Sequence, residues 1–448
     1  GHPDGPLDAR SLRPCVPASL RPCVPAPGPR RGHTRAAARP YRDGRTVPCA
    51  AARFIHSWRL QLELSTASPA EPPGDGLAAH AGQMSFDASQ PTDHETALGL
   101  RTPADLVAAV PYLLGFHPAD SLVLVSTRTA GQPGVEFTLR VDLPPPRAVA
   151  DLARELAGAV RAQRCDELLL VVVGGGAPVP VPRAPRAGHH LDPPRAEVVA
   201  AVVEACTNAG VLTRAAIWVA EVAAGTPWRC YGECGCVGAL PDPTCSPAAA
   251  AAVAAGQVTY ADRSELEQVV APAPRPVLRR RSALLNRRLD ELCEAGEPIP
   301  PSGPEVVLAL ERWIDLASGD GPRLSDEDVV DLCLALSDPL VRDAAFGFAF
   351  DSRAAGAERL WSTLVTEAPA PESAEAAVLL AHSALMRGDG ALAGIALARA
   401  QEIWPGHRLS AMIRSALEAG IGPDRLRDWF VEGSQRATEL LERRAEQW

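Results

Sequence analysis

The residues best suited to chemistry in this 448-residue sequence are cysteines that lie close together. They are Cys230, Cys234, Cys236 and Cys245. Four thiolates suit a structural zinc ion, which takes sulfur and nitrogen ligands in a tetrahedron. The spacing departs from the common two-residue knuckle, and the alternative is a loop whose thiols are free or redox-labile. The sequence therefore predicts that any bound metal is one structural zinc ion on these four cysteines.

A second candidate site is the string Phe-His-Pro-Ala-Asp-Ser at residues 116–121. His117, Asp120 and Ser121 are the residue types of a base, an orienting carboxylate and a nucleophile. Neighbours in sequence seldom converge in that way, and the chain has no Gly-x-Ser-x-Gly elbow. The competing interpretation, which we favour, is a structural turn in which Pro118 ends a helix and Asp120 bonds backbone amides.

Three glycines at residues 174–176 follow the apolar run Leu168–Val173. A phosphate-binding loop in this position needs a helix N-terminus immediately after it. The sequence continues instead as Ala-Pro-Val-Pro-Val-Pro, so we interpret the stretch as a flexible loop. Metal binding by His189, His190 and Asp192 is the weaker alternative, because no regular structure fixes their geometry.

Strand and helix patterns alternate between residues 85 and 271. The elements that they predict must position the candidate site residues. Thr102 is followed by Pro103 and Asp105, a pattern that predicts the start of a helix. The helix is expected to end at Gly115. Further helices are predicted over 148–164, 195–208 and 265–270, and strands over 122–125, 135–141, 168–173 and within 215–222. The first two strands suggest a hairpin, and the alternation implies parallel crossovers. The predicted fold class is α/β, a mixed sheet layer with crossover helices.

An all-helical part is predicted over residues 302–448, after a junction at 272–301 that carries a basic helix. Ser325 and Asp328 form a capping-box pattern, and further helices follow to the end of the chain. Gly388-Asp389 with Ala393, Ala400 and Pro405 matches the landmarks of a tetratricopeptide hairpin. Only one such repeat is marked, so degenerate repeats and an ordinary helical bundle both remain open.

The first 83 residues differ in composition from the rest. They contain 13 prolines, 11 arginines and 6 acidic residues, and an eight-residue sequence, SLRPCVPA, occurs twice in tandem. Such a composition predicts disorder. Met84 is the first methionine, and we expect translation to start there, with a basic tail or transit segment as the alternative.

The charge balance restricts the partners. All 44 basic residues are arginines, and the formal charge of the chain is −10. Without lysine there is no P-loop lysine and no Schiff base. The dense run from Arg275 to Arg288 is followed by acidic residues, so we expect a solvated helix face rather than a nucleic-acid surface. The apolar runs are too short to cross a membrane, and a cytoplasmic protein is expected.

One stretch resembles a known family. TPADLVAAVPYLLGFHPADSLVLVS (102–126) is similar to the signature of an actinobacterial family called domain of unknown function 4192, as are WRCYGECGC and GDGALAGIALARAQEIWPGH further along. The resemblance covers about residues 97–430 and implies no particular activity or ligand. The family resemblance implies an adjacent Cys-Cys-Pro in the cysteine loop, where this chain has Cys-Gly-Cys and then Thr-Cys-Ser-Pro.

Together these patterns predict a non-catalytic protein that binds another protein through its helical half, without nucleic acid or membrane. The alternative is a hydrolase or transferase that uses His117 and Asp120, with Ser121, in a cleft at the ends of the strands.

Overall fold

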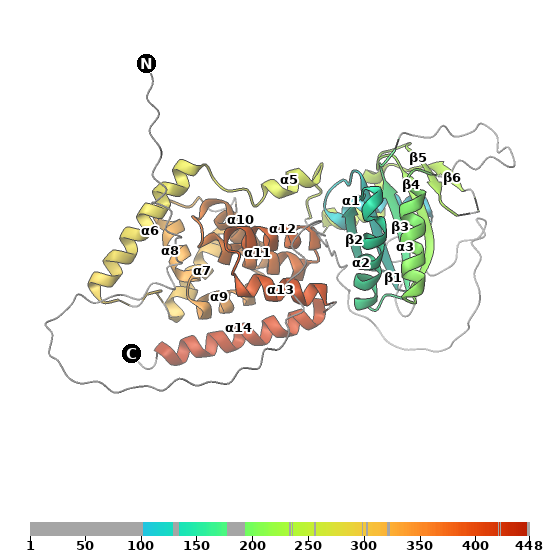
Figure 1. Cartoon of the computed structure of the whole chain (residues 1–448). Coiled ribbons are helices and arrows are strands. Elements are labelled where there is room, and N and C mark those ends of the chain that lie inside the picture. Colours follow the sequence, from blue (N-terminus) through green and yellow to red (C-terminus); the bar gives the residue numbers. More distant parts are fainter. Residues whose placement is uncertain are drawn as a thin grey trace, which may run out of the picture.

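The computed structural model describes residues 102–128, 134–176, 193–232, 234, 236–254, 257–297, 299–301, 303–319, 323–419, 421 and 423–445. The segment 1–83 and the candidate ligands His189, His190 and Asp192 lie outside these residues. The described chain forms two lobes, one built on a sheet and one built of helices, with a short helix between them (Figure 1).

The sheet lobe comprises the first half of the described chain. Its elements are α1 (Pro103–Leu114), β1 (Ser121–Arg128), β2 (Gly134–Asp142), η2 (Pro146–Ala148), α2 (Val149–Ala162), β3 (Glu167–Val173), α3 (Ala196–Asn208), β4 (Leu212–Val219), β5 (Pro227–Cys230), β6 (Val237–Ala239), η3 (Pro243–Cys245) and α4 (Pro247–Ala254). Strands β5 and β6 lie in a stretch for which the sequence predicted only a loop. They are four and three residues long and show no apolar alternation, so they carry little sequence signal.

The strand order in the mixed sheet is β2-β1-β3-β4-β5-β6. β1 is antiparallel to both β2 and β3, so β2 and β3 run in the same direction with β1 between them. Helix α2 therefore crosses over β1, and α3 makes the second crossover between the parallel strands β3 and β4. This arrangement confirms the predicted hairpin and the predicted crossover helices.

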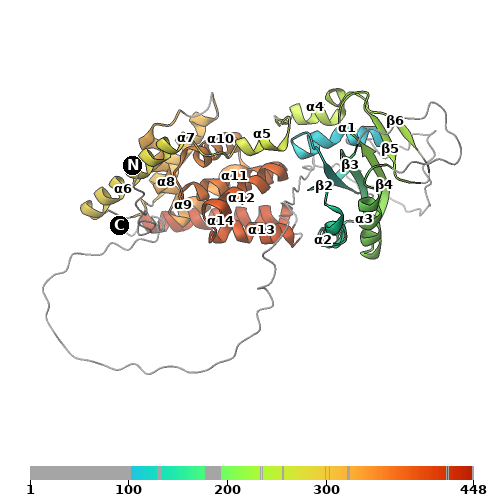
Figure 2. The ribbon, with the colours of Figure 1, turned by 45° about the horizontal axis from the view of Figure 1, so that its top comes forward.

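Alternating side chains assign the two faces of the sheet to two helical layers. Val123 and Val125 of β1 pack into the apolar cluster that contains α1, whereas Leu122 and Leu124 pack with α2 and α3. Figure 2 shows α1 and α4 on one side of the sheet and α2 and α3 on the other. Strand β3 is buried on both faces, as its uninterrupted apolar sequence predicted. Thr102 caps α1 in a capping box with Asp105, and α1 continues through Pro111 to Gly115.

The helical lobe follows the short helix α5 (Arg263–Gln268). Its elements are α6 (Arg275–Ala295), α7 (Pro304–Ala317), α8 (Asp326–Leu336), α9 (Pro339–Ala345), η4 (Phe346–Phe350), α10 (Ala354–Glu367), α11 (Ser373–Arg387), α12 (Gly390–Ile403), α13 (Arg408–Glu418) and α14 (Pro423–Ala445). The predicted capping box of Ser325 and Asp328 begins α8. The fold class, a mixed sheet followed by a mostly helical part, is confirmed.

Helix α11 is the centre of the helical lobe. It pairs with α12 as a hairpin around Gly388, whose φ is 85°, and the Asp389 carboxylate accepts a hydrogen bond from the Leu392 N–H at 2.9 Å. Almost every residue from Ser373 to Leu385 is buried, because α8, α9, α10 and α14 also contact this helix. The described helices thus form a bundle around α11, and the tetratricopeptide likeness stays a prediction.

Candidate functional site

The turn at residues 116–121 is fixed by a second turn, which follows the neighbouring strand β3 at the same end of the sheet. Asp120, at φ 42°, points its carboxylate at the glycine turn after β3, and its Oδ1 accepts a hydrogen bond from the Gly175 N–H at 2.8 Å. A β-carbon at Gly174 would lie only 2.7 Å from the same oxygen. The glycines that might suggest a phosphate loop therefore leave room for Asp120.

The other two residues of the string are engaged separately. The Ser121 hydroxyl is buried, donates to the Ala119 carbonyl at 2.6 Å and accepts from Arg140 Nε at 2.8 Å. The backbone N–H of His117 donates to the Tyr260 carbonyl at 3.1 Å. Within the described structure no hydrogen bond joins the side chains of His117, Asp120 and Ser121, so the geometry of a catalytic triad is not assembled here.

Three of the four candidate zinc ligands lie at the β5–β6 hairpin. The Cys230 N–H donates to the Cys236 carbonyl at 2.9 Å, which pairs the two residues across the hairpin. The Cys234 thiol interacts with the thiols of both Cys230 and Cys236. Cys234 and Cys236 are exposed, and Cys230 is half-buried. This set of three is called the thiol cluster below.

The thiols of the cluster differ in proton affinity. Burial opposes a charge on Cys234, but the N–H of Cys236 and the thiols of Cys236 and Cys230 outweigh it and lower the pKa of Cys234. The bond to Cys234 and burial raise the pKa of Cys236 to about 11. Burial chiefly raises the pKa of Cys230. A negative charge in the cluster is therefore best held on Cys234.

The fourth predicted ligand lies elsewhere. Cys245 is in η3, and no hydrogen bond or electrostatic interaction links it to the thiol cluster in the described structure. Among the described residues no group of three or more His, Cys, Asp or Glu side chains is arranged to hold a metal ion. The four-cysteine zinc site stays a prediction from the sequence.

An apolar hollow lies in the helical lobe, between α6, α7 and α8. Its volume is about 330 Å³, which is within the range of small-ligand pockets. The apolar lining residues are Leu292, Pro301, Val306, Ala309, Leu310, Trp313, Leu332, Leu334 and Ala335. This hollow is called the α6–α7–α8 groove below. Sequence reasoning missed it because its three walls are separate amphipathic helices, each of which predicts only core packing.

Charged residues line the same groove, and most are acidic. They are Glu297, Glu305, Asp331 and Arg288. Arg288 Nε lies 3.5 Å from Asp331, and its Nη1 lies 3.3 Å from Glu291. Burial raises the pKa of Asp331, against the effect of Arg288. Within the described residues Glu297 and Glu305 make no ion pair, so the groove carries uncompensated negative charge.

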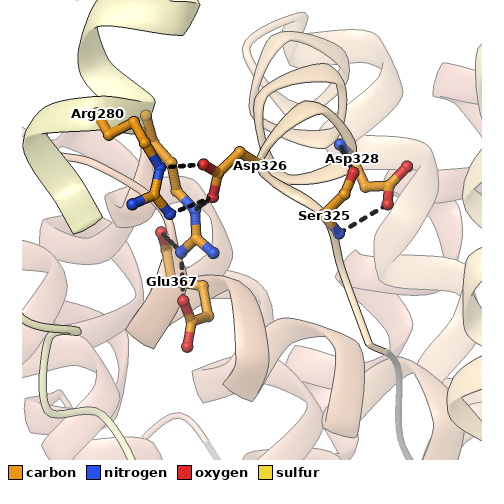
Figure 3. A network of polar contacts seen from close by, with 6 residues as sticks. Arg280, Ser325, Asp326, Asp328 and Glu367 are labelled. Carbon is orange, nitrogen blue, oxygen red and sulfur yellow. Dashed lines mark hydrogen bonds and ion pairs between the residues drawn. The ribbon is translucent and has the colours of Figure 1, made fainter.

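Helix α6, one wall of the groove, is held in place by an ion-pair network around the buried Arg281 (Figure 3). Arg281, only 6% exposed, donates to Asp326 at 2.8 Å and to the Glu367 carbonyl at 2.7 Å, and also pairs with the Glu367 carboxylate. Arg280 pairs with Asp326 from the outside. These bonds lower the pKa of Asp326 to about 2. The sequence had suggested that the basic run is a solvated helix face. This prediction is wrong for Arg281, which is buried in the network.

The apolar surface of the groove extends beyond its hollow along α7. Leu316 follows Ala309 and Trp313 at helical spacing, so it lies on the same face of the helix. It is 61% exposed. Leu308, which is 51% exposed, lies on a different face of α7 because it is two residues after Val306.

The fold defines a two-lobed protein in which a mixed sheet is joined to a helical bundle. In the described part of the chain, His117, Asp120 and Ser121 do not form a catalytic triad. The chain belongs to the family described as "Domain of unknown function (DUF4192)", whose model matches residues 103–424. Comparison with curated proteins and with solved structures gives no match. No helix in the described part of the chain is long and apolar enough to cross a membrane.

Proposed function

We propose that the protein is a non-catalytic binding module that takes up a segment of another protein in the α6–α7–α8 groove. The observation that carries this proposal is the groove itself, an apolar hollow of about 330 Å³ with acidic residues at its sides. Buried apolar anchors surrounded by a polar rim are the usual composition of a peptide-binding surface.

The dimensions of the groove suit a short segment. From Glu305 to Leu316 the surface follows α7 over about 16 Å, at the rise of an α-helix. A segment with two or three apolar side chains at helical spacing can place one of them against Trp313 and another against Leu316.

The charge of the lobe favours a basic partner. Residues 302–448 contain 24 acidic residues and 14 arginines, and Glu297 and Glu305 at the groove are without ion pairs in the described structure. Opposite charge steers a basic segment toward this surface and disfavours an acidic one. We therefore propose a partner segment in which apolar anchors are flanked by Arg or Lys.

The proposal is tested by selecting random 16-residue peptides on the full-length protein. Enriched peptides are expected to combine apolar anchors with Arg or Lys. The substitution Leu316→Glu should abolish their binding, whereas Leu308→Glu, the same change on another face of α7, should leave it intact. Enrichment of acidic peptides, no enrichment, or equal effects of the two substitutions would refute the proposal.

A further inference from the structure

The thiol cluster lies at the end of the sheet lobe that is farthest from the helical lobe. β6 is an edge strand, and both views place the β5–β6 hairpin away from the helical lobe (Figures 1 and 2). The cluster is thus separate from the proposed peptide groove, and its chemistry can be tested independently of it.

We propose that the thiol cluster is a redox site, in which Cys234 reacts with a hydroperoxide and then forms a disulfide with Cys230. The geometry supports this pairing. A β-carbon at Gly232 would lie 3.6 Å from Cys230 Sγ and 3.8 Å from Cys234 Sγ, so both sulfurs lie on the same side of this glycine. The Gly232 N–H donates to Cys230 Sγ at 3.4 Å and helps to fix its position.

Cys234 is placed to be the attacking sulfur. It is exposed, so a peroxide can reach its sulfur. The thiolate is the reactive form of cysteine toward peroxides, and reaction with a peroxide needs a sulfur that solvent can reach. Cys230 is half-buried at the end of β5, so it is held within reach and is less accessible to the oxidant.

The reaction balances in two steps. The Cys234 thiolate attacks the peroxide, an S–O bond forms, the O–O bond breaks, and the leaving oxygen takes a proton, so that sulfur is oxidised to sulfenic acid while the peroxide is reduced. The Cys230 sulfur then attacks the Cys234 sulfur. An S–S bond forms, the S–OH bond breaks, and the hydroxide leaves as water with the proton of the Cys230 thiol.

The experiment treats reduced full-length protein with one equivalent of hydrogen peroxide at pH 7 and maps disulfides and sulfenic acid by peptide mass spectrometry. A Cys230–Cys234 disulfide is expected, whereas Cys293, an exposed thiol outside the cluster, should form no intramolecular disulfide. In Cys230→Ser protein, a sulfenic acid on Cys234 should be trapped by dimedone.

The measurement on unsubstituted protein needs no variant, so a folding defect cannot obscure it. Oxidation of Cys234 without a Cys230–Cys234 bond, or no oxidation of Cys234 at all, overturns the proposal. So does stoichiometric zinc in protein purified without chelator, if the metal is lost on Cys234→Ser substitution, since the sulfurs would then be metal ligands.

Discussion

The Asp120 carboxylate and the Gly175 N–H are joined by a hydrogen bond of 2.8 Å between residues 55 positions apart. This bond connects the turn that leads into β1 with the turn that leaves β3. Asp120 could suggest a catalytic aspartate, and the glycines after β3 could suggest a phosphate loop. The structure shows instead that they form one structural unit, in which the carboxylate accepts a hydrogen bond from the glycine turn and the glycines leave room for the carboxylate.

We predict that Gly174→Ala destabilises the protein by about 2 kcal/mol more than Gly210→Ala. Both glycines have positive φ, 76° and 86°, but a β-carbon at Gly174 meets Asp120, whereas Gly210 faces open space. Urea unfolding of both variants measures the difference. Equal losses would show that Asp120 and the glycine turn are not tightly packed.

Asp120→Ala should cost about 1–2 kcal/mol of stability, because the Gly175 N–H loses its acceptor. Asp120→Asn should largely restore stability, since asparagine keeps an acceptor oxygen and tolerates positive φ. Urea unfolding checks this as well. If the negative charge of Asp120 were needed, Asp120→Asn would lose as much stability as Asp120→Ala.

His382 makes the helical lobe sensitive to acid. Its ring is packed among Phe346, Phe350 and Phe430, and its Nε2 is buried without a hydrogen-bond partner in the described structure. Burial, with a smaller effect of Arg427, lowers the pKa of His382 from 6.5 to about 3. Between these values the unfolded chain binds a proton that the folded chain does not, so stability falls as the pH falls from 6.5 toward 3.

The expected slope from His382 is about 1.4 kcal/mol per pH unit within that window. It appears as the difference between wild type and His382→Phe when urea unfolding is followed against pH. Arg427→Gln should keep most of the slope, because burial is the main cause. Parallel pH curves for wild type and His382→Phe would contradict the prediction.

Replacing Arg281 should be far more damaging than replacing its neighbour. Arg281→Met leaves Asp326 and Glu367 without their buried cation, and we expect a loss of about 3–4 kcal/mol. Arg280 is largely exposed, so Arg280→Met should have a small effect. Thermal unfolding of the two variants distinguishes a buried network from two surface pairs.

Much of the local structure could be predicted, because its causes are local. The Thr102–Asp105 and Ser325–Asp328 capping boxes and the helical hairpin at Gly388 depend on residues a few positions apart. The basic run could not be interpreted in the same way. Arg281 pairs with Asp326 and Glu367, which lie 45 and 86 positions away in the sequence.

The candidate sites depended even more on distant residues. The sequence grouped four cysteines by proximity, but only three of them lie at one hairpin in the structure. Nothing in the sequence near Trp313 marks the groove, because α6 and α8 supply its other walls. Local patterns thus identify elements, whereas a site depends on how the elements pack.

Salt should weaken binding in the groove without changing its apolar selectivity. For a selected basic peptide, raising the salt concentration from about 0.05 to 0.5 M screens the attraction to Glu297 and Glu305. Replacing both by glutamine should reduce that salt dependence, and Leu316→Ala should lower affinity equally at each salt concentration. Fluorescence anisotropy of the labelled peptide measures both effects. Salt-independent binding of such a peptide would argue against a role for these carboxylates.

The enclosure of α11 determines how the helical lobe comes apart. A helix with neighbours on every side cannot loosen alone, because any opening that reaches its amides must first displace the helices around it. Slow hydrogen exchange should therefore concentrate in α11, and its amides should exchange only when the whole lobe opens. The outer helices, and with them the walls of the groove, remain free to fluctuate around this slowly exchanging centre.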